Sequence, residues 1–277
     1  MKKIPKRYLL VLSLILSLGL SGLIAPSAQP IQARRYRFSR INHQRRYHHW
    51  TYRKHVNYRI SRSRFQIRRW TTHIATAVNS SASAKTSSLA RLNYEGSQIL
   101  ILDHDQPQFS RQTLSLHHGA WQHYGQLDHE NRVTAANAML NIRLMPRRGR
   151  EPLHVDPTGW HNKRISCGWL FNRSHLIGYQ FTGKNNNLRN LMTGTRQLND
   201  PDMSQYENQV AYYLRDTSNH YVRYRITPIF RANELLARGV HMEAESIGDN
   251  SIRLNVYIFN VEPGVTLNYK NGNSTVH

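Results

Sequence analysis

Residues 169–177 read Trp-Leu-Phe-Asn-Arg-Ser-His-Leu-Ile, and they are the most informative stretch of the sequence. The apolar run at residues 167–171 predicts a strand that leads into the polar motif Asn172 to His175. A histidine at a strand end can project its imidazole over a groove, and Arg173 would lie on the same side of an extended chain. A lone histidine after a strand is more often a hydrogen-bonded or exposed residue without a catalytic role, so this motif alone does not indicate a catalytic site.

Three further polar residues follow the motif. Asn190 closes a loop predicted for residues 185–190, and Asn199 precedes an amphipathic helix predicted for residues 201–214. Glu207 comes eight residues after Asn199, slightly more than two helical turns, so the two side chains share a face if the helix begins near residue 199. An oxygen-rich site of this kind suits Mg²⁺ or Mn²⁺. A nearby histidine as base and a bound cation are the parts that phosphodiester hydrolysis needs.

Each of these residues also has a plain structural interpretation. Asn190 fits turn chemistry, Asn199 fits the N-cap of the following helix, and Glu207 fits a solvated helix position. Spacing and residue type alone therefore leave a metal-dependent hydrolase as one of several interpretations.

The other patterns predict an α+β domain. Strands are expected at residues 97–102, 221–227 and 252–261, and the Ala-rich residues 132–140 favour a helix. In the second strand, Val222, Tyr224 and Ile226 should face away from Arg223 and Arg225. The single cysteine, Cys167, excludes an intrachain disulfide and is expected to be a small buried side chain.

The N-terminal third has a different composition. Residues 1–33 combine a basic start, an apolar run and small residues, which predicts an export signal cleaved after Ala28 or Ala33, or else an uncleaved membrane anchor. Residues 34–73 form an arm with 13 Lys and Arg, five His and no acid, interleaved with aromatic residues. We expect this arm to be largely disordered. Residues 74–90 are expected to be a linker, and residues 91–277 the folded domain.

The charge is unevenly distributed. The formal net charge is +22, yet all 16 acidic residues lie between Glu95 and Glu262. Residues 91–277 hold 20 Lys and Arg, so their net charge is only about +4. A cationic arm binds polyanions by counterion release without sequence specificity. Nucleic acid, anionic lipid and anionic wall polymers all remain candidates for the arm.

Taken together, these stretches resemble the DNA/RNA non-specific endonuclease family, and most of all its secreted streptococcal-type DNases and DNA-entry nucleases. The resemblance runs from about Ser97 to Tyr269. Its motifs are residues 169–177, residues 190–199, residues 203–213, Met145-Pro146 and residues 157–160.

The resemblance implies a ββα-metal (His-Me finger) core on a mixed or antiparallel sheet. It implies that His175 is the general base, that Asn199 is the protein ligand of Mg²⁺ (or Mn²⁺), and that Glu207 orients metal-bound water. Arg173 and Asn190 would hold the phosphate or order the site. The reaction implied is hydrolysis of DNA, with RNA as a further substrate, leaving 5′-phosphate ends. The commonest family motif is Asp-Arg-Gly-His, so Asn172 and Ser174 are departures that put any role of the Asp carboxylate in doubt.

Other basic residues are candidates for contact with nucleic acid. Arg147, Arg148, Arg150 and Arg196 join Arg173 in this group, although the first three also fit a solvated loop. His154 and His161 are expected to be surface histidines. The chain is expected outside the cell, secreted or membrane-anchored. The main alternative function is a non-catalytic cationic surface protein that captures DNA or anionic wall polymer.

Overall fold

The computed structural model describes residues 77–79 and 84–277. The predicted export signal, the predicted basic arm and residues 74–76 and 80–83 of the predicted linker lie outside the described residues. Within those described ranges, no helix is long and apolar enough to cross a bilayer.

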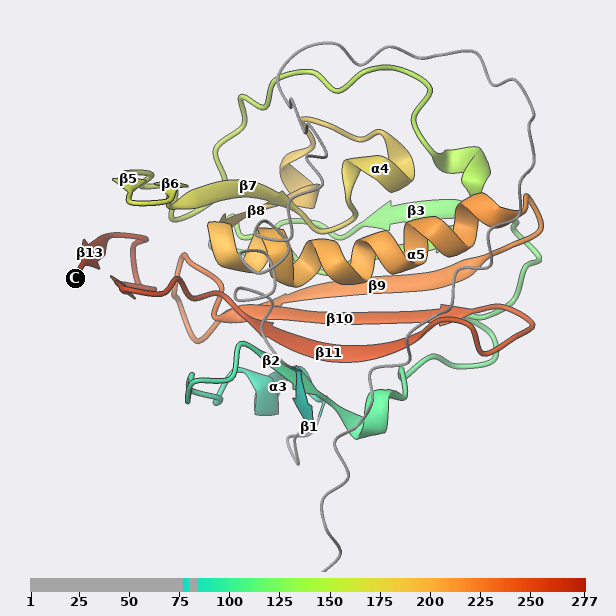
Figure 1. Cartoon of the computed structure of the whole chain (residues 1–277), viewed down its shortest axis with the longest axis horizontal. Coiled ribbons are helices and arrows are strands. Elements are labelled where there is room, and N and C mark those ends of the chain that lie inside the picture. The colour runs from blue at the N-terminus through green and yellow to red at the C-terminus, as the bar shows by residue number, and fades with distance from the viewer. Residues whose placement is uncertain (1–76, 80–83) are drawn as a thin grey trace, which may run out of the picture. The chain divides into compact units, whose positions relative to one another are not determined.

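Among the described residues, seven strands form one mixed sheet in the order β1-β2-β11-β10-β9-β4-β3 (Figure 1). β1 and β2 pair in parallel, and the other neighbours are antiparallel. The strands are Val78–Asn79 (β1), Ile99–Ile101 (β2), Trp121–Tyr124 (β3), Ala136–Leu140 (β4), Val222–Ile229 (β9), Gly239–Ser246 (β10) and Arg253–Phe259 (β11). Smaller two-stranded pairs are Arg164–Ile165 with Gly168–Trp169 (β5, β6) and Val265–Leu267 with Ser274–Val276 (β12, β13).

The long helix α5, Ser204–Asp216, covers one face of the sheet (Figure 1). Its buried residues Val210, Ala211 and Leu214 join one apolar cluster with alternate residues of β4, β9, β10 and β11. Because successive strand residues point to opposite faces, this cluster takes Val222, Tyr224 and Ile226 as the sequence predicts. The main core therefore lies between α5 and the sheet.

The opposite face of the sheet carries buried polar side chains. The Glu243 carboxylate is fully buried, accepts a hydrogen bond from the Gln108 backbone at 2.9 Å and pairs with Arg225 Nε at 2.6 Å. Arg223 donates to Asn137 Oδ1 at 2.6 Å and lies over the Phe109 ring. The Phe109 ring packs against both guanidinium groups, so these polar side chains are largely used within the fold.

A ββα unit, whose helix is α5, contains the motif of residues 172–175. It consists of the antiparallel strands β7, Phe171–His175, and β8, Leu191–Thr195, followed by a π-helical segment, Leu198–Met203, that leads into α5. The short helix α4, Tyr179–Thr182, and a 3₁₀ turn at Leu188–Asn190 connect the two strands. Further 3₁₀ turns occupy Asp103–Asp105 and Ile142–Leu144.

Three predictions about local structure are wrong. The strand expected at residues 167–171 is interrupted, because Cys167 lies in a turn, β6 spans only Gly168–Trp169, and β7 runs from Phe171 through the motif itself. Residues 132–140 do not form a helix, because Ala136–Leu140 are strand β4 between β3 and β9. Pairing on both sides outweighs the helix propensity of the alanines, whose small side chains fit under α5. Cys167 is exposed rather than buried, because it lies in the tight turn between β5 and β6.

The folded part also begins earlier than residue 91. Thr86–Leu89 form the short helix α3, within the expected linker. Leu89 is fully buried in a second apolar cluster with Leu102, Tyr257 and Phe259. Residues 84–90 are thus part of the domain, although the polar composition of this segment predicts a linker.

Candidate active site

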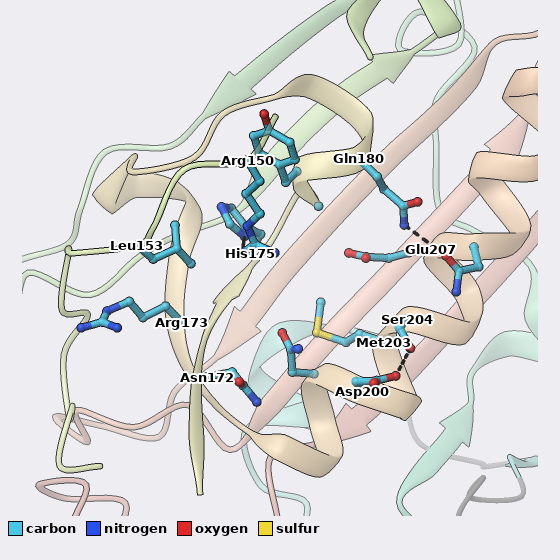
Figure 2. Close-up of a pocket in the computed structure, with 14 residues that line it drawn as sticks. Arg150, Leu153, Asn172, Arg173, His175, Gln180, Asp200, Met203, Ser204 and Glu207 are labelled. Carbon is cyan, nitrogen blue, oxygen red and sulfur yellow. Dashed lines mark hydrogen bonds between the residues drawn. The ribbon is translucent and has the colours of Figure 1, made fainter. Parts of the chain in front are cut away.

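Five of the predicted site residues line one cavity of about 560 Å³, namely Arg150, Arg173, His175, Asn199 and Glu207 (Figure 2). β7 supplies Asn172, Arg173 and His175, while the start of α5 and the π-helical segment supply Glu207 and Asn199. The other lining residues are Leu153, Gly178, Tyr179, Gln180, Asp200, Met203, Ser204 and Asn208. Asn199 and Glu207 line the same cavity, but α5 begins only at Ser204 and Asp200 is not helical, so the two do not share one helical face as predicted.

His175 is the last residue of β7 and is 7% exposed. Its Nε2 lies 2.9 Å from the carbonyl oxygen of Asn185, an acceptor that fixes the tautomer with the proton on Nε2. Burial lowers the pKa of His175 to about 4, against an opposing effect of the Asn185 hydrogen bond and with help from the Arg150 charge. The ring is therefore neutral near pH 7, and the lone pair of Nδ1 faces Arg150 Nη2 at 3.5 Å.

Glu207 extends from the first turn of α5 into the cavity (Figure 2). A Cβ added to Gly178 would lie 2.9 Å from both carboxylate oxygens, so the carboxylate packs against the bare glycine backbone. Burial raises the pKa of Glu207 to about 8, partly offset by Gln180 and Arg150. A cation close to this carboxyl would favour the ionised form.

The donor set fits a hard divalent cation. Among the described residues, the side-chain amides of Asn172 and Asn199 have no hydrogen-bond partner, and both line the cavity with Glu207. Within the same ranges, no group of three or more His, Cys, Asp or Glu side chains could hold a metal ion. Amide and carboxylate oxygens with room for several waters suit Mg²⁺ better than a soft metal. Asn199 is also not the N-cap of α5, because that position is Met203.

Arg173 lines the cavity, but its guanidinium points away from His175 and Glu207 (Figure 2). Arg173 Nε donates to the Val155 carbonyl at 2.8 Å, and the guanidinium pairs with the Asp156 carboxylate at 2.5 Å. It also lies 4.4 Å from the centre of the Trp160 ring. In this arrangement Arg173 binds the segment of residues 155–160 to β7.

Asn190 is fully buried and does not line the cavity. Its Oδ1 accepts a hydrogen bond from the Ile177 backbone N–H at 2.9 Å, and its Nδ2 donates to the Ile177 carbonyl at 3.0 Å. Both amide atoms are thus used to hold the chain that leaves β7. Of the two roles expected for Asn190, this geometry favours ordering the site over contacting the phosphate.

The remaining basic candidates fall into three places. Arg150 lines the cavity, with Nη2 at 3.5 Å from His175 Nδ1. Arg147 and Arg148 are exposed on the preceding loop. Arg196 lines a neighbouring cavity, where its Nε donates to the Trp169 carbonyl at 3.3 Å.

The departures at residues 172 and 174 have different structural consequences. Asn172 replaces a carboxylate with a neutral amide at the edge of the cavity. The Ser174 side chain of β7 is fully buried. A Cβ on Gly194 of the neighbouring strand would lie 2.3 Å from Ser174 Oγ. The serine therefore fits because residue 194 has no side chain.

Several contributors to the site escaped the sequence analysis. Gly178, Gln180 and the Asn185 carbonyl all come from the connection between β7 and β8, and Asp200 lines the cavity while accepting a hydrogen bond from Ser204 at 2.6 Å. A backbone carbonyl leaves no signal in residue type. The glycine three residues after His175 was the one readable sign, since a bare backbone allows close approach.

The fold and the cavity define the chain as a ββα-metal nuclease core. Residues 114–248 match the model of the DNA/RNA non-specific endonuclease family, which confirms the resemblance found in the sequence. A deoxyribonuclease of Streptococcus dysgalactiae subsp. equisimilis is 34% identical over 107 residues, which make up 37% of this chain and 32% of that protein. The match thus spans about a third of the length of this curated relative.

Solved structures show the same core. NucA from Streptococcus agalactiae with a magnesium ion bound is 26% identical, with a TM-score of 0.58, over 64% of this chain and 86% of NucA. Sda1 nuclease with a bound zinc ion is also 26% identical, with a TM-score of 0.51, over 57% of this chain and 80% of Sda1. Relatives of this fold have thus been solved with different metals.

Proposed function

We propose that this chain is an extracellular, metal-dependent endonuclease that hydrolyses DNA phosphodiester bonds without sequence specificity. The observation that carries the proposal is one cavity that combines a neutral, oriented histidine with the partnerless oxygen of Asn199 and the carboxylate of Glu207. The family match and the nuclease relatives support the same activity. The extracellular location rests on the predicted export signal at residues 1–33.

His175 acts as general base in this proposal. The Asn185 carbonyl holds the proton on Nε2, so Nδ1 takes the proton of the attacking water. Because burial lowers the pKa of His175 to about 4, the base is already deprotonated at neutral pH. The same contact keeps the ring pointed at the cavity, where the scissile phosphate would lie.

Asn199 would hold the divalent cation, with Glu207 positioned to orient water beside it. When bound, Mg²⁺ supplies positive charge to the phosphate and to the departing 3′ oxygen, which leaves a 5′-phosphate end. The Arg150 guanidinium, beside His175, adds further positive charge to the same cavity. Arg173 would reach the phosphate only after release from Asp156.

Metal removal tests the proposal directly. The purified full chain is incubated with plasmid DNA in Mg²⁺, in EDTA, and in EDTA followed by excess Mg²⁺. We expect cleavage only in the first and third conditions, with 5′-phosphate ends on the products. An RNA substrate in parallel establishes whether the ribose polymer is also cut.

The same assay separates the enzyme from the capture protein. A cationic capture protein would bind the plasmid in all three conditions and leave it intact, because its contacts are those of the basic segment at residues 34–73. Binding without cleavage in Mg²⁺ would overturn the proposed function.

A further inference from the structure

A second cavity of about 570 Å³ adjoins the candidate active site. It shares Leu153, Asn172 and Arg173 with the first cavity, so the two are continuous along β7. Its other lining residues are Trp160, Asn162, Trp169, Phe171 and Arg196. The mechanism proposed above uses none of these five.

Trp169 is the unusual member of this set. It lies on β6 of the small hairpin, is 47% exposed, and belongs to none of the apolar clusters formed by the described residues. Trp160, by contrast, packs against the cluster of Leu170 and Leu236. The exposed indole is thus not required to fill a core, although it carries a large apolar surface that water solvates poorly.

The surroundings of Trp169 are cationic. The Arg164 guanidinium lies over one face of the Trp169 ring, 4.9 Å from its centre, so a base would stack on the opposite face; Arg196 donates to the Trp169 carbonyl. A Cβ on Gly168 would lie 2.5 Å from Arg196 Nη2, so the bare glycine allows the guanidinium to pack beside the indole. The residues that line the cavity include no carboxylate.

We propose that Trp169 is a stacking platform for an unpaired base of the substrate strand, next to the phosphate held in the candidate active site. A base offers an aromatic face for the indole, and its flanking phosphates suit Arg164 and Arg196. Stacking requires the base to leave its duplex partner, so the subsite selects single-stranded or locally opened substrate. Because any base has an aromatic face, it adds affinity without sequence specificity. This inference rests on the proposed function for the position of the phosphate.

The test is a binding cycle on the full chain, run in EDTA. The probe is a dye-labelled single-stranded oligonucleotide with one native phosphodiester among neutral methylphosphonate linkages. Neutral linkages remove the polyanion attraction of the basic N-terminal segment. A second set of probes carries an abasic nucleotide on one side or the other of the native phosphodiester.

For the unaltered protein, we expect removal of one of the two flanking bases to raise the Kd about tenfold. Trp169→Ala should raise the Kd for the complete probe by a similar factor and should lose the response to that abasic position. Trp169→Phe should retain most of the affinity for the complete probe and most of the response to that abasic position. Tyr212→Ala, which removes an aromatic side chain that is 71% exposed on α5, is the matched control and should behave as the unaltered protein.

Equal responses of Trp169→Ala and the unaltered protein to base removal would overturn the inference. So would an unchanged Kd for the complete probe in Trp169→Ala. Cleavage in Mg²⁺ is measured separately with the same probes. A chain that shows the binding cycle but no cleavage would disprove the proposed function and leave the base-binding site in place.

Discussion

Polar side chains serve different purposes on the two sides of the central sheet. On the face away from α5, Glu243 is paired with Arg225 and with the Gln108 backbone, and His241 Nε2 lies 2.7 Å from Asn255 Oδ1. In the cavity beside α5, the amides of Asn172 and Asn199 have no partner among the described residues. Paired buried groups stabilise the fold, whereas amides that line a cavity without a partner can bind a ligand.

His175→Ala should produce the largest effect on the cavity side. Loss of the base is expected to lower the rate of plasmid cleavage by about two to four orders of magnitude, with DNA binding retained. Initial rates on supercoiled plasmid and a gel-shift titration measure the two quantities. His129→Ala, which removes a histidine side chain that is 81% exposed, is the control. Full cleavage activity in His175→Ala would show that another group is the base.

Glu243→Ala should produce the opposite outcome on the other side of the sheet. Removing the carboxylate takes away the partner of Arg225 Nε and of the Gln108 N–H. We therefore expect the free energy of unfolding to fall by about 3 kcal/mol. The rate per folded molecule should stay unchanged. Urea unfolding and cleavage at low temperature measure these.

Glu245→Ala is the matched control, since Glu245 is two residues further along β10 and its side chain has no hydrogen bond among the described residues. Equal destabilisation by both variants would show that the Glu243 pairing contributes little.

The effect of Asp202 on stability should depend on pH. It is fully buried, its Oδ1 accepts a hydrogen bond from Gln197, and its Oδ2 has no partner within the described residues. Burial raises its pKa from 3.8 to about 7, so between these values the folded chain keeps a proton that the unfolded chain loses. The free energy of unfolding should therefore fall as pH rises from about 4 to about 7.

Asp202→Asn should remove this part of the pH dependence and be the more stable form at pH 7.5. Urea unfolding of both proteins at pH 5 and pH 7.5 provides the comparison. An identical dependence on pH in the two proteins would assign the titration to another group.

The sequence predicts the parts of this fold that have clear alternation. The strand at residues 221–227 has its core and polar faces as predicted, and the helix through Glu207 brings that residue to the same cavity as Asn199. The strand at residues 136–140 was missed, because its alanines follow helix propensity and only the pairing with β3 and β9 makes them a strand. Local propensity does not contain such long-range pairing.

The candidate site shows the same division. Residue type and spacing made His175, Asn199 and Glu207 candidates, and the family resemblance gave their expected roles; the structure brings all three to one cavity. The Asn185 carbonyl and the close approach of Gly178 to Glu207 depend on how the connection between β7 and β8 folds back. The direction of the Arg173 side chain also could not be predicted. This side chain is long and flexible, and its partner Asp156 lies well before it in the sequence.

The contact between Ser174 and Gly194 restricts how this motif can change in descent or in design. A side chain at one of these positions fits only while the other leaves the space free, so the two residues form a coupled pair. A chain that carries serine at position 174 should therefore keep glycine at position 194. A search for further members with this variant motif should therefore treat positions 174 and 194 as one unit, and a designer who alters one should alter the other in the same step.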